Sequence, residues 1–283
     1  MQAREGEGRS EEMEFTVIDT AVETLEKSVI FHVVKEIIGF ILYMHQQIPA
    51  ILQDITLEFD TMQTECKDLE SVLTQSEVKS SLRRKHNGRM REVKQGIKRL
   101  EKLMKAVSNI QTALQLMLNE VHGIEGVILV LGASPIRPQH VYEMSFFHGR
   151  VVAESTTDYT KSRMAEALSR KAIRALISSG AGSVSYAGQT KLFLLMKAPA
   201  TLNMPLHFLP KRDFRYSKKI IPVRLRIKCK VQDQDMSVSH HASATSQSRS
   251  SISCPDSTSN DLIWFQCRHT IKGLPYKTPS QEE

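Results

Sequence analysis

Residues 222–231 alternate between apolar and basic side chains, and this alternation is the strongest constraint that the sequence places on the fold. When a pattern repeats every two residues, successive side chains point to opposite faces of a strand. We therefore expect an antiparallel strand with one face on a core and the other in water. The apolar face carries Val223, Leu225, Ile227, Cys229 and Val231, and the basic face carries Arg224, Arg226, Lys228 and Lys230.

Shorter apolar runs predict further strands. Residues 127–131 and 192–196 have the composition of buried strands. Residues 142–152 can pair with the first of these across a turn at residues 134–138. Together with the alternating segment, these runs predict a sheet in the second half of the chain.

A last apolar run lies at residues 262–267 and contains two adjacent aromatic residues. Trp264 and Phe265 must point to opposite faces of a strand, because side chains alternate. We favour Phe265 as the residue that anchors the strand in the core, since Ile263 and Cys267 share its side. The alternative is that both aromatic residues are ordinary core residues.

Apolar residues also recur at helical spacing. Residues 29–47 predict a helix that Pro49 ends. A longer pattern covers residues 62–121, with a break at residues 86–88. Its spacing fits one helix in a globular core or a helical hairpin, and a coiled-coil oligomer is the alternative. Helices that cover one face of an antiparallel sheet make an α+β domain.

A third helical pattern, at residues 159–179, is the most informative for function. With Leu168 at the centre of the buried face, a rotation of about 100° per residue places Ile173 and Ile177 on the outward face. An apolar anchor flanked by arginine is typical of a protein–protein interface. The alternative is that a loop covers both isoleucines, or that Ile177 packs against the helix cap. The flanking arginines are Arg170 and Arg174.

The formal net charge is +7, and the basic residues form two clusters. Nucleic-acid binding would use such clusters for phosphate contacts, but no aromatic stacking residues are interleaved with them. We therefore favour an acidic protein partner or a solvated surface over nucleic acid. The first cluster is Lys79, Arg83, Arg84, Lys85, Arg89, Arg91, Lys94, Lys98, Arg99, Lys102 and Lys105; the second is Lys211, Arg212, Arg215, Lys218, Lys219, Arg224, Arg226, Lys228 and Lys230.

The motifs of the common enzyme classes do not occur in the sequence. It contains no phosphate-binding glycine loop, no GxSxG and no HExxH. The adjacent His240 and His241 have no carboxylate or cysteine spaced to complete a metal site. No apolar run reaches the roughly 20 residues of a membrane span. We expect no enzymatic activity, no cofactor, no metal and no membrane partner.

Two stretches have the composition of disordered chain. Residues 1–27 are acidic, and we expect a partly disordered tail whose first part is solvated. Residues 232–260 are rich in serine and cannot bury enough apolar surface to offset their ordering entropy. The cysteines have no metal-ligand spacing, which predicts reduced thiols in a nuclear or cytosolic protein. They are Cys66, Cys229, Cys254 and Cys267.

Four segments, in order along the chain, resemble the comet adaptor family, which binds the spindle-checkpoint protein Mad-two. The most specific is "DLIWFQCRHTIKG" at residues 261–273, with its aromatic strand and Lys-Gly pair. The other three are "LYMHQQIP" at residues 42–49, "ILVLGASPIRPQHVYEM" at residues 128–144 and "LPKRDFRY" at residues 209–216.

The resemblance implies a HORMA-like fold, with three core helices packed on an antiparallel sheet and a C-terminal "safety belt". The HORMA-like domain would cover residues 28–273, between the acidic tail and a C-terminal tail at residues 274–283. A basic helical insertion at residues 57–105 and the serine-rich loop would interrupt it.

The resemblance also implies a function. Comet adaptors bind the closed conformer of Mad-two and present it to a hexameric AAA+ ATPase of the pachytene-checkpoint type, which silences the spindle assembly checkpoint. The same ATPase remodels meiotic chromosome-axis HORMA proteins, so a meiotic role is a natural extension. The expected location is the nucleus and cytoplasm, including kinetochores or chromosomes.

The resemblance also implies roles for individual residues of this sequence. The critical aromatic residue of the family's third helix falls on Ile173, which keeps an apolar anchor of smaller area. A partner-contacting glutamine falls on Met44, which departs from the family. The ATPase-docking pair falls on Pro210 and Lys211. The implied Mad-two interface is Ile173, Ile177, Arg170, Arg174, Tyr43, Met44 and Gln47, and the implied safety belt contains Ile263, Trp264 and Phe265.

Two other classes of protein remain as alternatives. The first is a basic coiled-coil chromatin or nucleic-acid-binding protein that uses residues 83–105. The second is a structural coiled-coil scaffold, in which residues 93–121 would self-associate.

Overall fold

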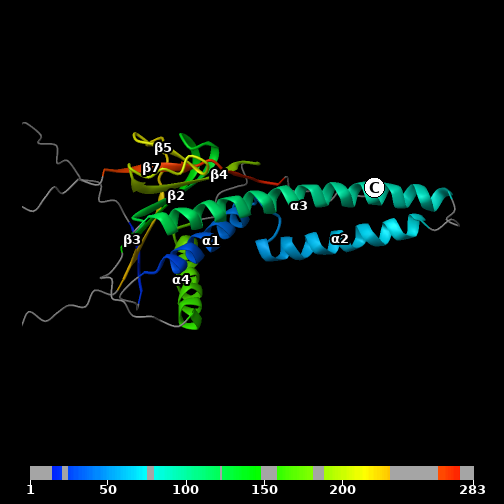
Figure 1. The fold of residues 1–283 in the computed structure, drawn as a ribbon, viewed down its shortest axis with the longest axis horizontal. Coiled ribbons are helices and arrows are strands. Elements are labelled where there is room, and N and C mark those ends of the chain that lie inside the picture. Colours follow the sequence, from blue (N-terminus) through cyan, green and yellow to red (C-terminus); the bar gives the residue numbers. More distant parts are fainter. Residues whose placement is uncertain are drawn as a thin grey trace, which may run out of the picture.

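The computed structural model describes residues 15–20, 25–74, 80–121, 123–147, 158–180, 188–229 and 261–274. In this part of the chain, four helices accompany one eight-stranded mixed sheet, which is an α+β architecture (Figure 1). The helices are α1 (Lys27–Met44), α2 (Leu52–Thr74), α3 (Ser80–Glu120) and α4 (Asp158–Ser178). The strands are β1 (Thr16–Asp19), β2 (Gly126–Ser134), β3 (Arg137–Phe147), β4 (Lys191–Pro199), β5 (Phe208–Lys211), β6 (Val223–Lys228), β7 (Leu262–Cys267) and β8 (Ile271–Lys272).

The strand order is β1-β6-β3-β2-β4-β7-β5, and β8 pairs with β4 beyond the end of β7. The predicted antiparallel pairing of β2 with β3 is confirmed. The predicted bounds are wrong, because β3 begins at Arg137 instead of residue 142, and Ser134 pairs with Arg137 across a tighter turn. The predicted antiparallel strand at residues 222–231 is wrong in its direction. Strand β6 runs parallel to both β1 and β3, so the sheet is mixed.

The predicted faces of β6 are correct on the apolar side. Leu225 and Ile227 are buried in the main core. The basic side, expected in water, is partly covered instead. Arg224 Nε donates to Glu143 Oε2 over 2.7 Å, and the Arg226 guanidinium lies 3.9 Å from the centre of the Phe15 ring.

The sheet has two apolar faces of unequal size. The larger core contains the inward side chains of α1, α4 and the second half of α3, and alternate residues of the strands, such as Leu129 and Leu194. Residues one position along, such as Ile128 and Leu195, form a smaller core on the opposite face. Side chains of the segment between β5 and β6 and of β7 pack on this smaller core: Phe214, Tyr216, Ile220 and Trp264.

Helix α1 is the central helix of the larger core. Its buried residues recur every three or four positions and cover most of its circumference, so it packs on several elements. The helix ends at Met44, before the predicted end at residue 47, and Gln46 then adopts a positive φ of 51°. The chain thus turns sharply between α1 and Pro49.

Helices α2 and α3 form an antiparallel hairpin, and its tip projects away from the sheet as an arm (Figure 1). This agrees with the predicted helical hairpin, but the predicted break at residues 86–88 is wrong, because α3 continues through Gly88. The second half of α3 buries Ile110, Leu114 and Leu118 in the main core, which extends along this helix as far as Leu100. Farther along the arm, Gly96 of α3 lies against Met62 of α2, since a β-carbon on Gly96 would lie 2.8 Å from the Met62 sulfur. One helix therefore belongs to both the core and the arm.

None of the helices in the described ranges is long and apolar enough to cross a membrane. Cys66, Cys229 and Cys267 are free thiols, and the latter two are buried. The acidic stretch predicted as a partly disordered tail at residues 1–27 contains strand β1, so it is ordered in part. Its first 14 residues, the serine-rich loop at residues 232–260 with Cys254, and the end of the chain from residue 275 lie outside the described residues.

Candidate protein-binding surfaces

Helix α4 packs on α1 and on the edge formed by β1 and β6. The predicted buried face is correct, because Leu168, Ala172 and Leu176 are buried. The helix ends where Gly180 adopts a positive φ of 78° and donates its N–H to the carbonyl of Ile177. This is a glycine C-cap, which the glycine-rich composition after the helix indicates.

The outward side of α4 carries the residues expected at a partner interface. Ile177 is 52% exposed, whereas Ile173 is only half-buried, so the wheel placed Ile177 correctly and overstated the exposure of Ile173. Arg170 and Arg174 are both exposed. Arg170 forms an ion pair with Glu166 one turn earlier, which holds it along the helix.

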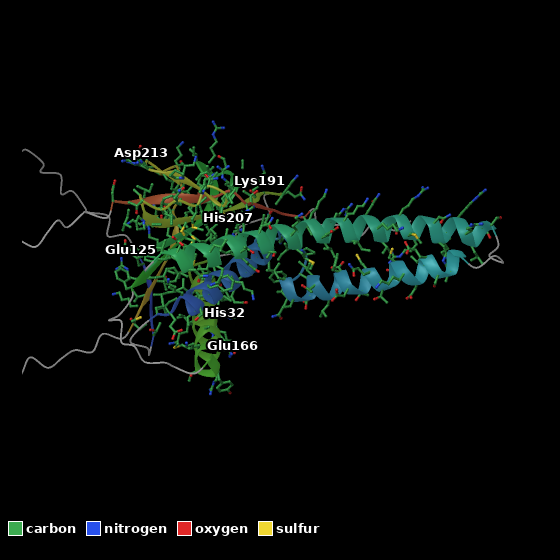
Figure 2. The ribbon with its side chains drawn as sticks, in the orientation of Figure 1. His32, Glu125, Glu166, Lys191, His207 and Asp213 are labelled. Carbon is green, nitrogen blue, oxygen red and sulfur yellow. The ribbon has the colours of Figure 1, made fainter. Side chains whose placement is uncertain are left out.

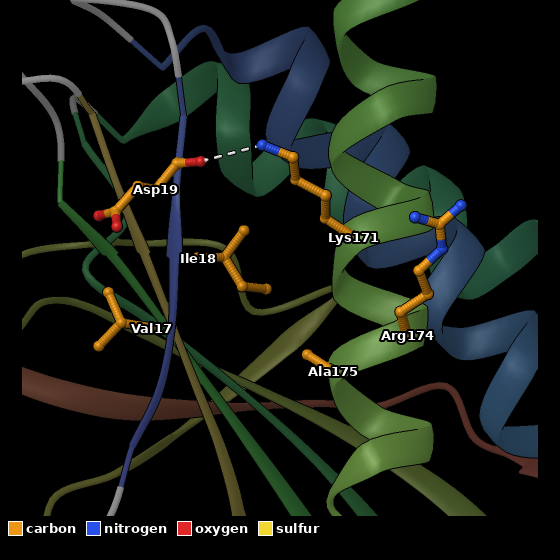
Figure 3. Close-up of a pocket in the computed structure, with 6 residues that line it drawn as sticks. All are labelled: Val17, Ile18, Asp19, Lys171, Arg174 and Ala175. Carbon is orange, nitrogen blue, oxygen red and sulfur yellow. Dashed lines mark hydrogen bonds between the residues drawn. The ribbon is translucent and has the colours of Figure 1, made fainter.

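A shallow cavity of about 430 Å³ separates β1 from α4 (Figure 3). Its walls are Val17, Ile18, Asp19, Lys171, Arg174 and Ala175. Lys171 Nζ donates to the carbonyl oxygen of Asp19 over 3.3 Å, so this lysine ties α4 to the edge strand. Arg174 points away from that hydrogen bond, on the other side of α4 (Figure 3).

The end of α1 supplies only part of the predicted interface. Tyr43 is 44% exposed and Met44 is half-buried, so both side chains are accessible to a partner. Gln47 is 3% exposed. Its prediction as an interface residue is corrected here, because its side chain belongs to the interior of the molecule.

Gln47 joins three segments that are distant in sequence. Its Nε2 donates to the carbonyls of His45 and Gly188, and its Oε1 accepts the N–H of Thr190 over 2.8 Å. Its backbone carbonyl accepts the N–H of Leu274 over 2.7 Å. The turn after α1 is thereby bonded to the start of β4 and to the chain after β8.

Beside this junction lies a cluster that the sequence analysis did not identify. His45 Nε2 and the Tyr142 hydroxyl share a hydrogen bond, and the rings of His45 and His140 lie 4.1 Å apart. Burial, with His140 as a second cause, lowers the pKa of His45 to about 4. Burial also raises the pKa of Tyr142 to about 12. No local pattern signals this cluster, because the three residues come from two distant segments.

The predicted ATPase-docking pair lies on β5, which forms one edge of the sheet. Pro210 and Lys211 are exposed, and they pair with Phe265 and Trp264 of β7. Proline is tolerated at an edge because it has no N–H to donate to a further strand. The exposed pair thus lies at the opposite end of the strand order from β1, beside which α4 packs.

The second basic cluster divides into exposed and paired residues. Arg212, Arg215, Lys218 and Lys219 are exposed and follow directly after Lys211. Arg224 is half-buried and bonded to Glu143, which also accepts a hydrogen bond from the Tyr216 hydroxyl. Burial, and then the Glu143 carboxylate, raise the pKa of Tyr216. The exposed subset extends the cationic surface that begins at Lys211.

The two aromatic residues of β7 occupy opposite faces, as predicted. Phe265 is buried in the main core together with Ile263. Trp264 is half-buried on the other face, where its ring makes an edge contact with Phe214 at 6.5 Å. The strand therefore connects the two cores of the sheet.

The described residues bring no three His, Cys, Asp or Glu side chains into a metal-binding group. Neither a scan of protein-family models nor a search of curated proteins found a match to this sequence.

Proposed function

We propose that this protein is a HORMA-like adaptor that binds the closed conformer of Mad-two and delivers it to a hexameric AAA+ ATPase of the pachytene-checkpoint type. The observation that carries the proposal is Ile177, a large apolar side chain that is 52% exposed beside Ile173 on an arginine-bearing helix face. Exposed apolar residues flanked by arginine are typical of interface hot spots.

The fold supports an adaptor because the two candidate surfaces are separate. Helix α4 packs beside the β1 edge, whereas Pro210 and Lys211 are exposed on β5 at the other edge. An adaptor must hold two proteins at once, so its contact surfaces cannot overlap. The mixed sheet with α1, α3 and α4 in its main core is compatible with a HORMA-like domain, in which β7 and β8 would correspond to the safety belt.

Paired variants test the assignment of the two surfaces. Ile177→Glu places a charge in the proposed Mad-two contact, and we expect a loss of about 2 kcal/mol, or roughly thirtyfold in affinity. Ser178→Glu adds the same charge at the next exposed position of α4 and should bind Mad-two normally. Replacing Pro210 and Lys211 by alanine should abolish ATPase binding and leave Mad-two binding intact.

The measurement is co-precipitation of both partners by the full chain. Loss of both partners in the Pro210→Ala, Lys211→Ala variant would contradict the two-surface arrangement. Undiminished recovery of Mad-two by Ile177→Glu would contradict the α4 contact.

A further inference from the structure

The α2–α3 arm takes no part in the proposed adaptor function, yet one side of it is strongly cationic. Figure 2 shows nitrogen-tipped side chains along the side of α3 that faces away from α2. At about 100° per residue, five of the basic residues fall within about 60° of one another on the helix wheel. We call them the α3 stripe: Arg84, Arg91, Lys98, Lys102 and Lys105.

The α3 stripe lies opposite the buried face of the same helix. Val93, Leu100 and Leu103 are buried and face roughly the other way on the wheel, whereas all five stripe residues are exposed. Arg84 and Lys105 are 21 positions apart, so the stripe is about 32 Å long at 1.5 Å per residue. The helix thus holds a straight row of cations in water.

The ion pairs within the arm do not involve the residues of the α3 stripe. Arg89 pairs with Glu65 and Glu92, and Lys94 pairs with Glu70. Within the described part of the chain, none of the five stripe residues has an ion pair or a hydrogen bond from its side chain. Glu92 lies about 105° from the middle of the stripe on the wheel, whereas Glu101 lies about 40° from Lys105 and one turn before it, so a carboxylate borders the stripe at that end.

We propose that the α3 stripe binds the sugar–phosphate backbone of a nucleic-acid duplex. The stripe contains no apolar or aromatic residue: the other positions on or beside this face between Arg84 and Lys105 include Asn87, Gly88 and Gln95. Protein interfaces are usually centred on a buried apolar or aromatic side chain, whereas contacts with a phosphate backbone need only charge. A length of about 32 Å also matches one turn of duplex, about 34 Å.

The α3 stripe favours binding to a duplex over binding to a single strand. The missing aromatic residues argue against single-stranded binding by stacking, but duplex backbone contacts do not require them. What the sequence pattern did not show is that the cations share one exposed face. The binding would not distinguish base sequences, because phosphate contacts carry no sequence information directly.

The test is a titration of the full chain with a fluorescent 30-base-pair duplex, as DNA and as RNA, at several salt concentrations. Five phosphate contacts on DNA predict a slope of about −4.5 for log affinity against log salt concentration. The affinity should therefore fall roughly 500-fold between 50 and 200 mM salt. The two duplexes show which nucleic acid the stripe prefers.

Two charge-reversal variants with the same net charge separate the stripe from overall basicity. One replaces Arg91, Lys98 and Lys102 by glutamate, and the other replaces Arg212, Arg215 and Lys218, which are also exposed. Each reversal removes two charge units, so both variants have a formal net charge of +1 instead of +7. The stripe variant should bind at least 30-fold more weakly with a slope near −2, and the control should stay within about threefold of wild type.

Each of the other outcomes overturns the proposal. Equal losses in the two variants would mean that only total charge matters. An unchanged stripe variant, or binding to phosphatidylserine vesicles without binding to either duplex, would also overturn it. A glutamine version of the stripe variant, with circular dichroism, excludes unfolding as the cause of a loss. Since the stripe lies apart from α4 and β5, Mad-two binding should survive in the stripe variant.

Discussion

Gly273 packs directly against Gln47: a β-carbon on Gly273 would lie 2.2 Å from Gln47 Oε1. The same Oε1 accepts the N–H of Thr190, and Gly273 donates its own N–H to the Thr190 carbonyl. The end of the proposed safety belt is therefore held against α1 and β4 by hydrogen bonds that leave no space for a side chain.

Gly273→Ala should lower the free energy of unfolding by about 2 kcal/mol, because the added methyl group must displace the buried Gln47 amide. Urea denaturation measures the change. The control is Gly88→Ala in α3, where a β-carbon meets nothing within 4 Å and alanine should stabilise the helix by up to about 1 kcal/mol. Equal stability of Gly273→Ala and wild type would contradict the packing.

Gln47→Ala should cost about 2–3 kcal/mol, because it leaves the Thr190 N–H without its acceptor and removes two donated hydrogen bonds. It also removes the obstacle to a side chain at residue 273. The double variant with Gly273→Ala should therefore be more stable than the sum of the two single effects predicts. Strict additivity in urea denaturation would show that the two residues are not coupled.

Phe265→Ala should destabilise the protein more than Trp264→Ala. Phe265 is 3% exposed in the main core, so its truncation should cost about 3–5 kcal/mol. Trp264 is only half-buried on the smaller face, so we expect about 2 kcal/mol. Thermal or urea unfolding of the two variants gives the order directly. A larger loss from Trp264→Ala would mean that β7 is anchored by its other face.

The half-buried His45 should make stability depend on pH. Its pKa in the folded protein, about 4, lies below the ordinary value of 6.5, so the unfolded chain binds this proton more readily. The free energy of unfolding should therefore fall as the pH drops from 6.5 toward 4 and should level off above 6.5. The change should be on the order of 2 kcal/mol.

The measurement is the urea midpoint of wild type and His45→Gln between pH 4 and pH 7. The difference between the two proteins should change across this range, because glutamine has no proton to lose. Tyr142→Phe is the control: it removes the hydrogen-bond partner but keeps His45 buried beside His140, so it should keep the pH dependence. A constant difference for His45→Gln would contradict the burial of a neutral imidazole.

Sequence patterns predicted the faces of the elements better than their partners. The alternation in β6 correctly placed Leu225 and Ile227 in the core. It could not reveal that both neighbouring strands are parallel, because side-chain period carries no information on strand direction. In α3, Gly88 and its neighbours suggested a break, but a glycine costs a helix only about 1 kcal/mol, and packing of α3 on α2 can offset that.

In the candidate site too, the sequence predicted local features better than contacts between distant segments. The helical wheel identified Ile177 as an outward apolar residue, because the information is local to α4. The burial of Gln47 could not be foreseen, because its hydrogen-bond partners at Gly188 and Thr190 lie more than 140 positions away. The cluster of His45, His140 and Tyr142 was missed for the same reason.

The most direct test of the proposed function is a calorimetric titration of this chain with purified Mad-two, held separately in its closed and its open conformer. The proposal predicts saturable one-to-one binding to the closed conformer and at least thirtyfold weaker binding to the open one. Ile177→Glu should weaken the closed-conformer interaction by about the same factor. No binding to closed Mad-two, or equal affinity for the two conformers, would contradict the proposal.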